Sequence, residues 1–212
     1  MLHRRPQLSE DVAASIRQQI VTGVLTPGTF VRIDDTAGEL GVSATPVREA
    51  LVALRGEGLV ELVPRRGYRV NELTERDIED IFWLQGTIAA ALARRAAQHI
   101  TNEQIEALRA VNDRLRDAVA RSDFESVESC EFEFHRYINR FAGGTKLAWF
   151  LLGAVRYTPS RLYASNRQWG EHAVRHHEQL IEAFRRRDVE LVGDLTCRHF
   201  LSGAELVTRL TG

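Results

Sequence analysis

Apolar residues in the first 73 positions recur at the spacings of short helices separated by turns. In the first stretch they follow one another at intervals of four, at Val12, Ile16, Ile20 and Val24. This interval places them on one face of a helix, which we expect to begin at Ser9 and to end at Gly23 and the Pro27-Gly28 pair. A short extended piece at residues 30–33 and a brief helix at residues 36–40 are predicted to follow.

The next helix is predicted from residues that favour a helix N-terminus. Ser43 and Thr45 are both good N-caps, and Pro46 suits the first helical turn. Apolar residues mark one face of this helix, which ends near Gly58: Val47, Leu51 and Leu54. Two β-like runs, residues 59–63 and 68–70, flank a tight turn at residues 64–67, so the pattern predicts a β-hairpin.

Three helices followed by a hairpin form a winged helix-turn-helix, in which the third helix can lie in the DNA major groove, about 12 Å wide. Side chains that suit DNA are expected on that helix and at the hairpin tip: Ser43, Thr45, Arg48, Arg65 and Arg66. Hydroxyls contact phosphates, and arginine reads guanine or grips phosphate. Double-stranded DNA is therefore the expected partner. Outside such a motif, Arg48 would be more simply a surface arginine paired with a carboxylate.

Residues 74–212 show almost uninterrupted helical periodicity. The chain is therefore predicted to be mainly α, with a winged helix-turn-helix domain at residues 1–73 and a helical domain at residues 74–212. Capping sequences open successive helices at Thr74, Thr101, Ser122 and Asp188. About six helices with short connections form an antiparallel bundle. The strongly apolar run at residues 147–157 is expected at its centre, and Pro159 ends that run.

Composition excludes several classes of protein. The chain has 212 residues, of which 44% are hydrophobic and 27% charged, and its formal net charge is -1; this is ordinary globular composition and argues against disorder. No apolar run reaches the roughly 18 residues of a membrane span, and the N-terminus lacks the apolar segment of a signal peptide. Two cysteines, Cys130 and Cys197, do not make a disulfide scaffold. We therefore expect a cytoplasmic protein with no membrane partner.

Histidines gather in the helical part, where five of the seven lie between His135 and His199. Glu131 and His135 are four residues apart and share a helix face. His177 and His199 are equally distant from the turn at Asp188, so they lie level in an antiparallel helical hairpin. One carboxylate and three imidazoles can surround a divalent ion and leave positions open for water or a ligand. This donor set suits zinc, our first expectation, and also nickel, manganese or iron.

Each of these histidines, taken alone, is more simply a solvated side chain. His172 and His176 are also four residues apart and could imitate a metal-binding pair, and His3 and His99 are expected at the surface. The four-residue metal site is therefore a hypothesis that rests on spacing.

Several spaced motifs in the first part resemble the GntR superfamily of bacterial transcription regulators. The matching stretches cover about residues 9–71 and are Gly23-Val24-Leu25-Thr26-Pro27-Gly28, Leu40-Gly41-Val42-Ser43-Ala44-Thr45-Pro46-Val47-Arg48-Glu49-Ala50-Leu51, Leu54, Glu57-Gly58-Leu59-Val60 and Pro64-Arg65-Arg66-Gly67. The resemblance implies that the third helix and the hairpin tip, Gly67 included, contact DNA. Ala44 stands where the family usually carries an arginine that contacts DNA, which bears on the operator sequence and not on the fold.

The second part resembles, over roughly residues 75–210, the FCD ligand-binding domain of the FadR subfamily. The motifs are Phe134-His135 with an acid four residues before the histidine, His177-Glu178 followed by Leu180-Ile181-Glu182-Ala183, and Arg198-His199-Phe200. In many relatives an aspartate and three histidines bind a metal that helps to hold a small carboxylate effector. The resemblance implies the same role here for four residues: Glu131, His135, His177 and His199. Glu131 is one methylene longer than the usual aspartate, and Gln85 and Ala89 stand where relatives often carry arginine and glutamate.

These features together predict a ligand-responsive DNA-binding transcription regulator, and not an enzyme. We expect a repressor that acts as a homodimer on two half-sites. The effector would bind beside the metal, and four residues are candidate partners for it: Arg156, Arg161, Tyr163 and Asn166. Each of them is equally well explained as a surface or structural residue. Two alternatives stay open: a metal-dependent hydrolase, although the chain has no His-Glu-x-x-His motif, and a constitutive DNA-binding dimer without an effector.

Overall fold

The computed structural model describes the backbone of residues 5–158 and 164–211, and the side chains of residues 8–158 and 164–207. The chain divides after Asp77 into two compact units, which we call the N-terminal unit and the helical unit. Their boundary lies in the first turn of a helix that begins at Glu75, close to the predicted boundary between residues 73 and 74. None of the described helices is long and apolar enough to cross a membrane.

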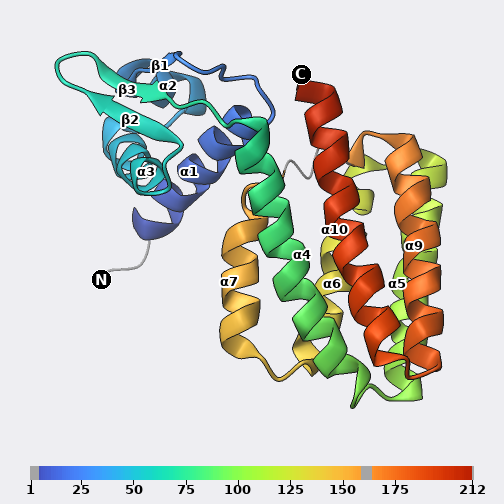
Figure 1. The fold of residues 1–212 in the computed structure, drawn as a ribbon. Helices are drawn as coiled ribbons and strands as arrows, with labels where there is room; N and C mark the ends of the chain where they lie inside the picture. Colours follow the sequence, from blue (N-terminus) through green and yellow to red (C-terminus); the bar gives the residue numbers. More distant parts are fainter. Residues whose placement is uncertain (1–4, 159–163, 212) are drawn as a thin grey trace. The chain divides into compact units, whose positions relative to one another are not determined.

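The described part of the N-terminal unit holds three helices and a small antiparallel sheet (Figure 1). In chain order its elements are α1 (Arg5–Val21), β1 (Phe30–Val31), α2 (Ile33–Leu40), α3 (Ala44–Gly56), β2 (Val60–Val63) and β3 (Gly67–Val70). The strand order is β1-β3-β2, so Tyr68 of β3 lies opposite both Val31 and Leu62. The predicted winged helix-turn-helix is confirmed, and the extended piece adds a third strand to its hairpin.

The first helix differs from its prediction at both ends. α1 begins at Arg5 and not at Ser9, because Pro6 suits a first helical turn, where its missing N–H leaves no hydrogen bond unmade. The helix ends at Val21, so Val24 lies beyond it, and that side chain is 72% exposed instead of lying on the apolar face. The extended piece is also shorter than predicted, because Ile33 already begins α2.

The buried face of α3 holds the N-terminal unit together. Its buried side chains are Pro46, Val47, Ala50, Leu51 and Leu54. Where α3 ends, Arg17 of α1 donates two hydrogen bonds to the Glu57 carboxylate, at 2.8 and 2.7 Å. Arg17 is buried, and a charge removed from water needs such a bidentate partner. The ion pair fixes α1 against the end of α3, a contact that the sequence pattern did not predict.

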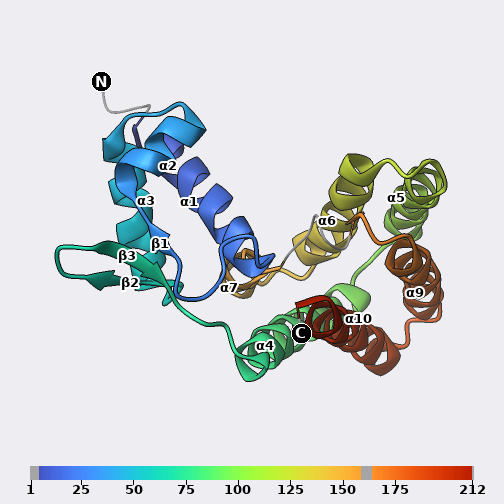
Figure 2. The same cartoon turned by 90° about the horizontal axis from the view of Figure 1, so that it is seen from above.

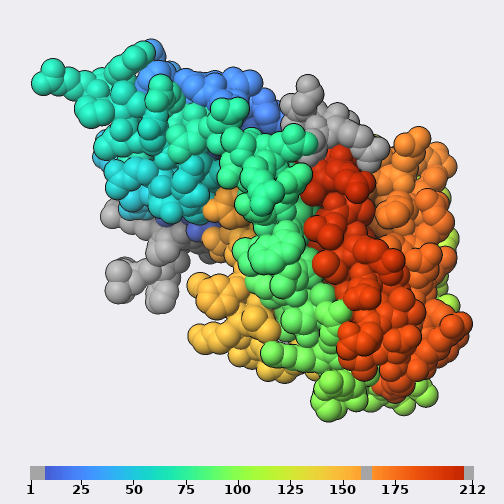
Figure 3. Space-filling view, viewed as in Figure 1, coloured from blue at the N-terminus to red at the C-terminus, as the bar shows by residue number. Residues whose placement is uncertain are grey.

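Six helices make up the described part of the helical unit, in agreement with the predicted bundle. They are α4 (Glu75–Ala97), α5 (Asn102–Arg121), α6 (Phe124–Phe141), α7 (Thr145–Val155), α9 (Arg167–Arg185) and α10 (Val189–Thr211). α5 packs against both α6 and α9, and α4, α10 and α9 lie side by side along one face (Figures 2 and 3). Fully buried side chains fill the centre, among them Leu92, Leu108, Leu115, Phe134 and Phe184.

Capping interactions set the helix boundaries, mostly as the sequence predicts. Thr101 and Gln104 form the predicted capping box of α5, in which each side chain accepts a hydrogen bond from the backbone N–H of the other. Asp188 caps α10 by accepting from the backbone N–H three residues later, at 3.0 Å. The cap predicted at Ser122 is wrong. Asp123 caps α6, because Ser122 ends α5 with a left-handed φ of 55°.

α7 is the main departure from the predicted fold. The apolar run that forms most of it was expected at the bundle centre, yet only Leu151 and Ala154 of this helix are buried. Three large side chains are exposed to solvent, by 66% for Trp149, 57% for Phe150 and 49% for Leu152. α7 therefore lies at the surface of the bundle, and a side chain of α4 donates a hydrogen bond to its Ala154 carbonyl.

Candidate metal centre and DNA-binding surface

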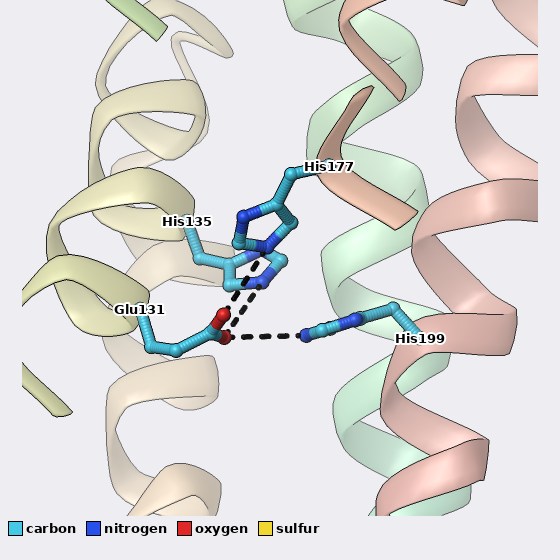
Figure 4. Close-up of side chains that lie close together, drawn as sticks. All are labelled: Glu131, His135, His177 and His199. Atoms are coloured by element: carbon cyan, nitrogen blue, oxygen red, sulfur yellow. Dashed lines mark ion pairs between the residues drawn. The ribbon is translucent and has the colours of Figure 1, made fainter. Parts of the chain in front are cut away.

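Four side chains from three helices converge inside the helical unit (Figure 4). Glu131 and His135 come from α6, His177 from α9 and His199 from α10, and one donor atom of each lies within 4.8 Å of the others. The Nε2 atoms of His199, His177 and His135 lie 3.4, 3.6 and 3.9 Å from a carboxylate oxygen of Glu131. The structure thus brings together all four residues that the sequence singles out. The extra methylene of Glu131 does not keep its carboxylate from the cluster.

These distances suit a shared cation better than hydrogen bonds. Two ligand atoms that are each about 2.1 Å from a tetrahedral ion lie about 3.4 Å apart, whereas N–H···O hydrogen bonds centre near about 2.9 Å. Three buried atoms, Glu131 Oε1, His135 Nε2 and His177 Nε2, have no hydrogen-bond partner among the described residues. Since buried polar atoms are normally partnered, this donor set fits a divalent metal ion.

Burial keeps two of the imidazoles in the form that binds metal. Burial, and after it the charge that neighbouring histidines would carry, holds the pKa of His135 and of His177 well below the usual value of 6.5. Both rings are therefore neutral near pH 7, as metal coordination requires. A metal ion would therefore not have to displace the second proton of an imidazolium at either residue at that pH.

Two residues behind the cluster hold the His177 ring. The Phe134 ring stacks on it with 3.7 Å between centroids and 6° between planes. Asn112 of α5 places its Oδ1 3.2 Å from His177 Nδ1, and its Nδ2 donates to the Val174 carbonyl at 3.1 Å. Asn112 is not among the predicted site residues. It lies four residues after Leu108 on the buried face of α5, where an amide among apolar side chains signals a specific partner.

A fourth histidine, His176, is buried beside the cluster. Its ring centroid is 5.1 Å from that of His199, and burial lowers its pKa to about 3. His172, which precedes it by four residues, is exposed, and their ring centroids are 6.0 Å apart. His172 and His176, which are four residues apart as metal-binding pairs on helices are, therefore lie between the surface of α9 and the buried cluster.

The predicted effector-binding residues fall in different places. Asn166 is the N-cap of α9, where its Oδ1 accepts a hydrogen bond from Trp169 N at 2.9 Å, so its side chain has a structural role. Arg156 is exposed at the C-terminal end of α7. Arg161 and Tyr163, like Pro159, lie outside the described residues.

Gln85, where relatives often carry arginine, is fully buried in α4. Its Nε2 donates to the Ala154 carbonyl at 2.9 Å, and its Oε1 accepts from Thr158 Oγ1 at 3.3 Å. Both ends of the amide therefore hold the end of α7 and the turn that follows it. Ala89, where relatives often carry glutamate, is buried as well.

In the N-terminal unit, the predicted DNA-binding residues of α3 lie away from its buried face. Ser43 is the N-cap of α3, but its side chain makes no capping hydrogen bond. Thr45 is the second residue of the helix and not its cap, and both Thr45 and Arg48 are exposed. The hydroxyl groups and the guanidinium are thus placed along the first turns of α3, on the side that faces solvent.

Arg65 and Arg66 form the exposed tip between β2 and β3. Arg65, with φ 63°, and Gly67, with φ 101°, are in the left-handed region, which gives the turn its tightness. The Arg66 guanidinium lies 4.4 Å from the centre of the Phe30 ring of β1, a cation–π contact that orients this side chain. The tip and α3 together form the surface that the sequence predicts for DNA.

Known protein families match both units of the chain. Residues 8–70 match the sequence model of the family described as bacterial regulatory proteins, gntR family. Residues 80–202, more than half of the chain, match that of the FCD domain. The two matches follow one another along the chain in the same order as the two units.

Individual relatives are similar over nearly the whole chain. The identity is 27% over 206 residues with the HTH-type transcriptional repressor RspR of Escherichia coli, over 96% of this chain and 90% of RspR. It is 27% over 197 residues with the probable D-xylose utilization operon transcriptional repressor of Paenarthrobacter nicotinovorans, over 92% and 86% of the two chains. The solved structure of E. coli McbR/YncC superposes with a TM-score of 0.74 at 20% identity, covering 97% of this chain and 99% of that one, and so supports the fold.

These relatives and both matching domains are transcription regulators and not enzymes, so the hydrolase alternative has no support among them. The GntR helix-turn-helix implies that the N-terminal unit binds operator DNA, and the FCD domain implies a small-molecule effector. The chain therefore belongs to the GntR family of bacterial transcription regulators and, because an FCD domain follows its winged helix-turn-helix, to the FadR-type subfamily.

Proposed function

We propose that this regulator is a repressor that acts as a homodimer, and that its FCD domain binds a divalent metal ion together with a small carboxylate effector. Glu131, His135, His177 and His199 would hold the ion. Zinc suits such a mixed nitrogen and oxygen donor set, and nickel, manganese and iron are the alternatives. When bound, the ion supplies a fixed positive charge to which carboxylate oxygens can coordinate.

This proposal rests on a group of buried donor atoms that have no hydrogen-bond partners. Among the described residues, Glu131 Oε1, His135 Nε2 and His177 Nε2 have none, although each lies in the interior of a well-packed bundle. An unmade hydrogen bond at a buried polar atom costs about 1–3 kcal/mol. Three such atoms that converge on one point are best explained by a bound cation.

Charge balance favours an anionic effector. A divalent ion contributes two positive charges and Glu131 one negative charge, so the occupied site would keep a net positive charge in the interior. A buried charge is costly unless it is paired, and a carboxylate would pair with it. Gln85 is uncharged and its amide is already hydrogen-bonded to the protein. The ion would therefore be the main anchor of the carboxylate, with no help from a cation at position 85.

An apolar surface formed by α7 and its neighbour α4 supports the homodimer. We call it the α4–α7 surface and define it by its exposed large side chains: Trp83, Leu84, Trp149, Phe150 and Leu152. The Trp149 and Phe150 rings are in contact, with centroids 5.1 Å apart, and large apolar side chains that gather at the surface mark protein–protein interfaces. Since a winged helix-turn-helix reads two half-sites only as a pair, we assign the α4–α7 surface to a second copy of the chain.

Operator titration tests the proposal. Operator sites are first selected from a random DNA pool by metal-loaded protein, and small carboxylates, including sugar acids, are screened by thermal shift. A carboxylate that stabilises metal-loaded protein is expected to weaken its operator binding about 5–150-fold, the usual range of allosteric coupling. Metal-free protein should show neither effect. If no small molecule changes operator affinity, the constitutive dimer is the better description.

Arg48→Ala is expected to weaken binding to the selected operator by about 1–3 kcal/mol, the contribution of a bidentate contact to a base. Arg48 is exposed on the first turns of α3, so the substitution leaves the buried face of the helix unchanged. A gel-shift titration at fixed salt measures the effect. Arg55→Ala is the matched control, because Arg55 is also exposed but lies in the last turn of α3. Equal affinity losses in the two variants would rule out base reading by Arg48.

A further inference from the structure

A line of imidazole rings leads from the proposed metal site to the surface of the helical unit. His199 belongs to the site, and its ring centroid is 5.1 Å from that of His176. The His176 ring is in turn 6.0 Å from that of His172. Exposure changes in the same order: His172 is exposed, His176 is 8% exposed, and His199 in the cluster is 5% exposed. A buried metal site needs a path from solvent, and these rings lie along one.

The spacing of these rings matches the spacing inside the cluster. There the ring centroid of His135 is 4.7 Å from that of His199 and 5.2 Å from that of His177. The centroids of His177 and His199 are 5.3 Å apart. Two imidazoles bound to one tetrahedral ion have ring centres about 5 Å apart. The separation of 5.1 Å between His176 and His199 equals this spacing, and the separation of 6.0 Å between His172 and His176 exceeds it by about 1 Å.

Two buried nitrogen atoms along this line have no hydrogen-bond partner among the described residues. His176 Nδ1 and His199 Nδ1 are both buried, and neither has a hydrogen-bond partner in the part of the chain that the structure describes. In a folded protein such atoms normally have partners. His176 is thus a buried ring beside the metal site, and its Nδ1 makes no hydrogen bond to any of the described residues.

We propose that His172 and His176 form a surface histidine pair that captures the metal ion and passes it to the buried site. This inference rests on the metal site proposed above. Two histidines four residues apart share one helix face, and this is the spacing with which helical histidine pairs bind zinc. The pair lies on α9, which also carries His177, and the next ring on the path, His199, belongs to α10.

Neighbouring charges make the surface histidine pair a transient site and not a second permanent one. The guanidinium of Arg175 disfavours positive charge at His172, and that of Arg198 does so at His176, whereas Glu205 favours it at His172. Two imidazoles near two guanidinium groups hold a cation weakly. The cluster around Glu131 has four ligands and holds it more firmly.

A loading route has a kinetic signature that a metal ligand does not have. Removing an intermediate binding position from the path raises the free-energy barrier for entry of the ion and for its exit by the same amount. The association and dissociation rates then fall by the same factor, and the affinity of the site stays unchanged. Loss of a residue that hydrogen-bonds to a metal ligand and orients it instead lowers the affinity for the metal, by about 10–100-fold. The two roles are thus separable by experiment.

The experiment uses full-length metal-free protein and Co²⁺, whose visible absorption reports binding. His172→Ala is expected to slow Co²⁺ uptake about tenfold, which corresponds to a barrier higher by about 1.4 kcal/mol. Release of Co²⁺ to a chelator should slow by the same factor, with unchanged stoichiometry and Kd. His99→Ala is the matched control, because His99 is also exposed in the helical unit and lies in the turn after α4. It should load at the wild-type rate.

Each other outcome overturns a specific claim. Equal uptake rates in His172→Ala and wild type would overturn the loading route and leave the metal site standing. A lower affinity without slower release would make His172 a supporting residue and also overturn the route. If wild-type protein binds no stoichiometric Co²⁺, both the metal site and the route fail.

Discussion

Protein that carries both His177→Ala and His199→Ala is expected to retain no divalent metal after purification, whereas wild type should retain about one ion per chain. The two substitutions remove half of the four donor groups, and they remove the ligands on α9 and α10 together. The remaining Glu131 and His135 lie on α6 alone, and two ligands on one helix do not enclose an ion. Elemental analysis of the purified proteins measures the difference.

Two further variants distinguish loss of the metal ligands from a folding defect. Replacement of His177 leaves a cavity beside the stacked Phe134 ring, which destabilises the bundle in its own right. Glu131→Gln keeps the side-chain volume and removes the charge, so it should weaken metal binding without a cavity. His99→Ala, at an exposed position outside the cluster, should keep the full metal content. A full complement of metal in the double variant would contradict the proposed site.

Trp149→Glu is expected to convert the protein to monomers and to lower operator affinity about 10²–10⁴-fold. Trp149 is the most exposed of the three large apolar side chains of α7, and a carboxylate there would lose its hydration inside a closed interface. A monomer engages one half-site, so the gain that comes from linking two binding events disappears, and that gain is about 10²–10⁴-fold. Light scattering measures the mass, and gel-shift titration measures the affinity.

Phe132→Glu is the control for the dimer. Phe132 is comparably exposed but lies on α6, outside the α4–α7 surface. It should leave both mass and operator affinity unchanged. If Trp149→Glu stays dimeric while Phe132→Glu dissociates, the interface has been assigned to the wrong face. If wild type is itself monomeric at concentrations that saturate the operator, the homodimer is wrong.

The parts of this structure that were predictable follow from repeating geometry. Glu131 and His135 share a face because of the helical repeat, and His177 and His199 lie level because their helices turn midway between them. Neither argument needs knowledge of the packing. The winged helix-turn-helix was predictable for a similar reason, since each of its turns is marked by glycine or proline.

The failures concern features that depend on what packs against a residue. The apolar run of α7 indicates burial, but it does not say whether this chain or a second copy covers it. Asn112 and His176 are single polar residues on buried helix faces, and their partners come from other helices. The competition between Ser122 and Asp123 for one cap depended on where the preceding helix ended. Local sequence contains none of this information.

The amide of Asn112 has a consequence for where His177 carries its proton. Because Nδ2 of Asn112 donates to the Val174 carbonyl, Oδ1 is the atom that faces His177 Nδ1. An amide oxygen can only accept, so the neutral His177 ring holds its hydrogen on Nδ1. The lone pair is then on Nε2, the atom that lies 3.6 Å from the Glu131 carboxylate. The protein thus selects one tautomer in advance, and an arriving ion would need neither a ring flip nor a proton transfer at this ligand.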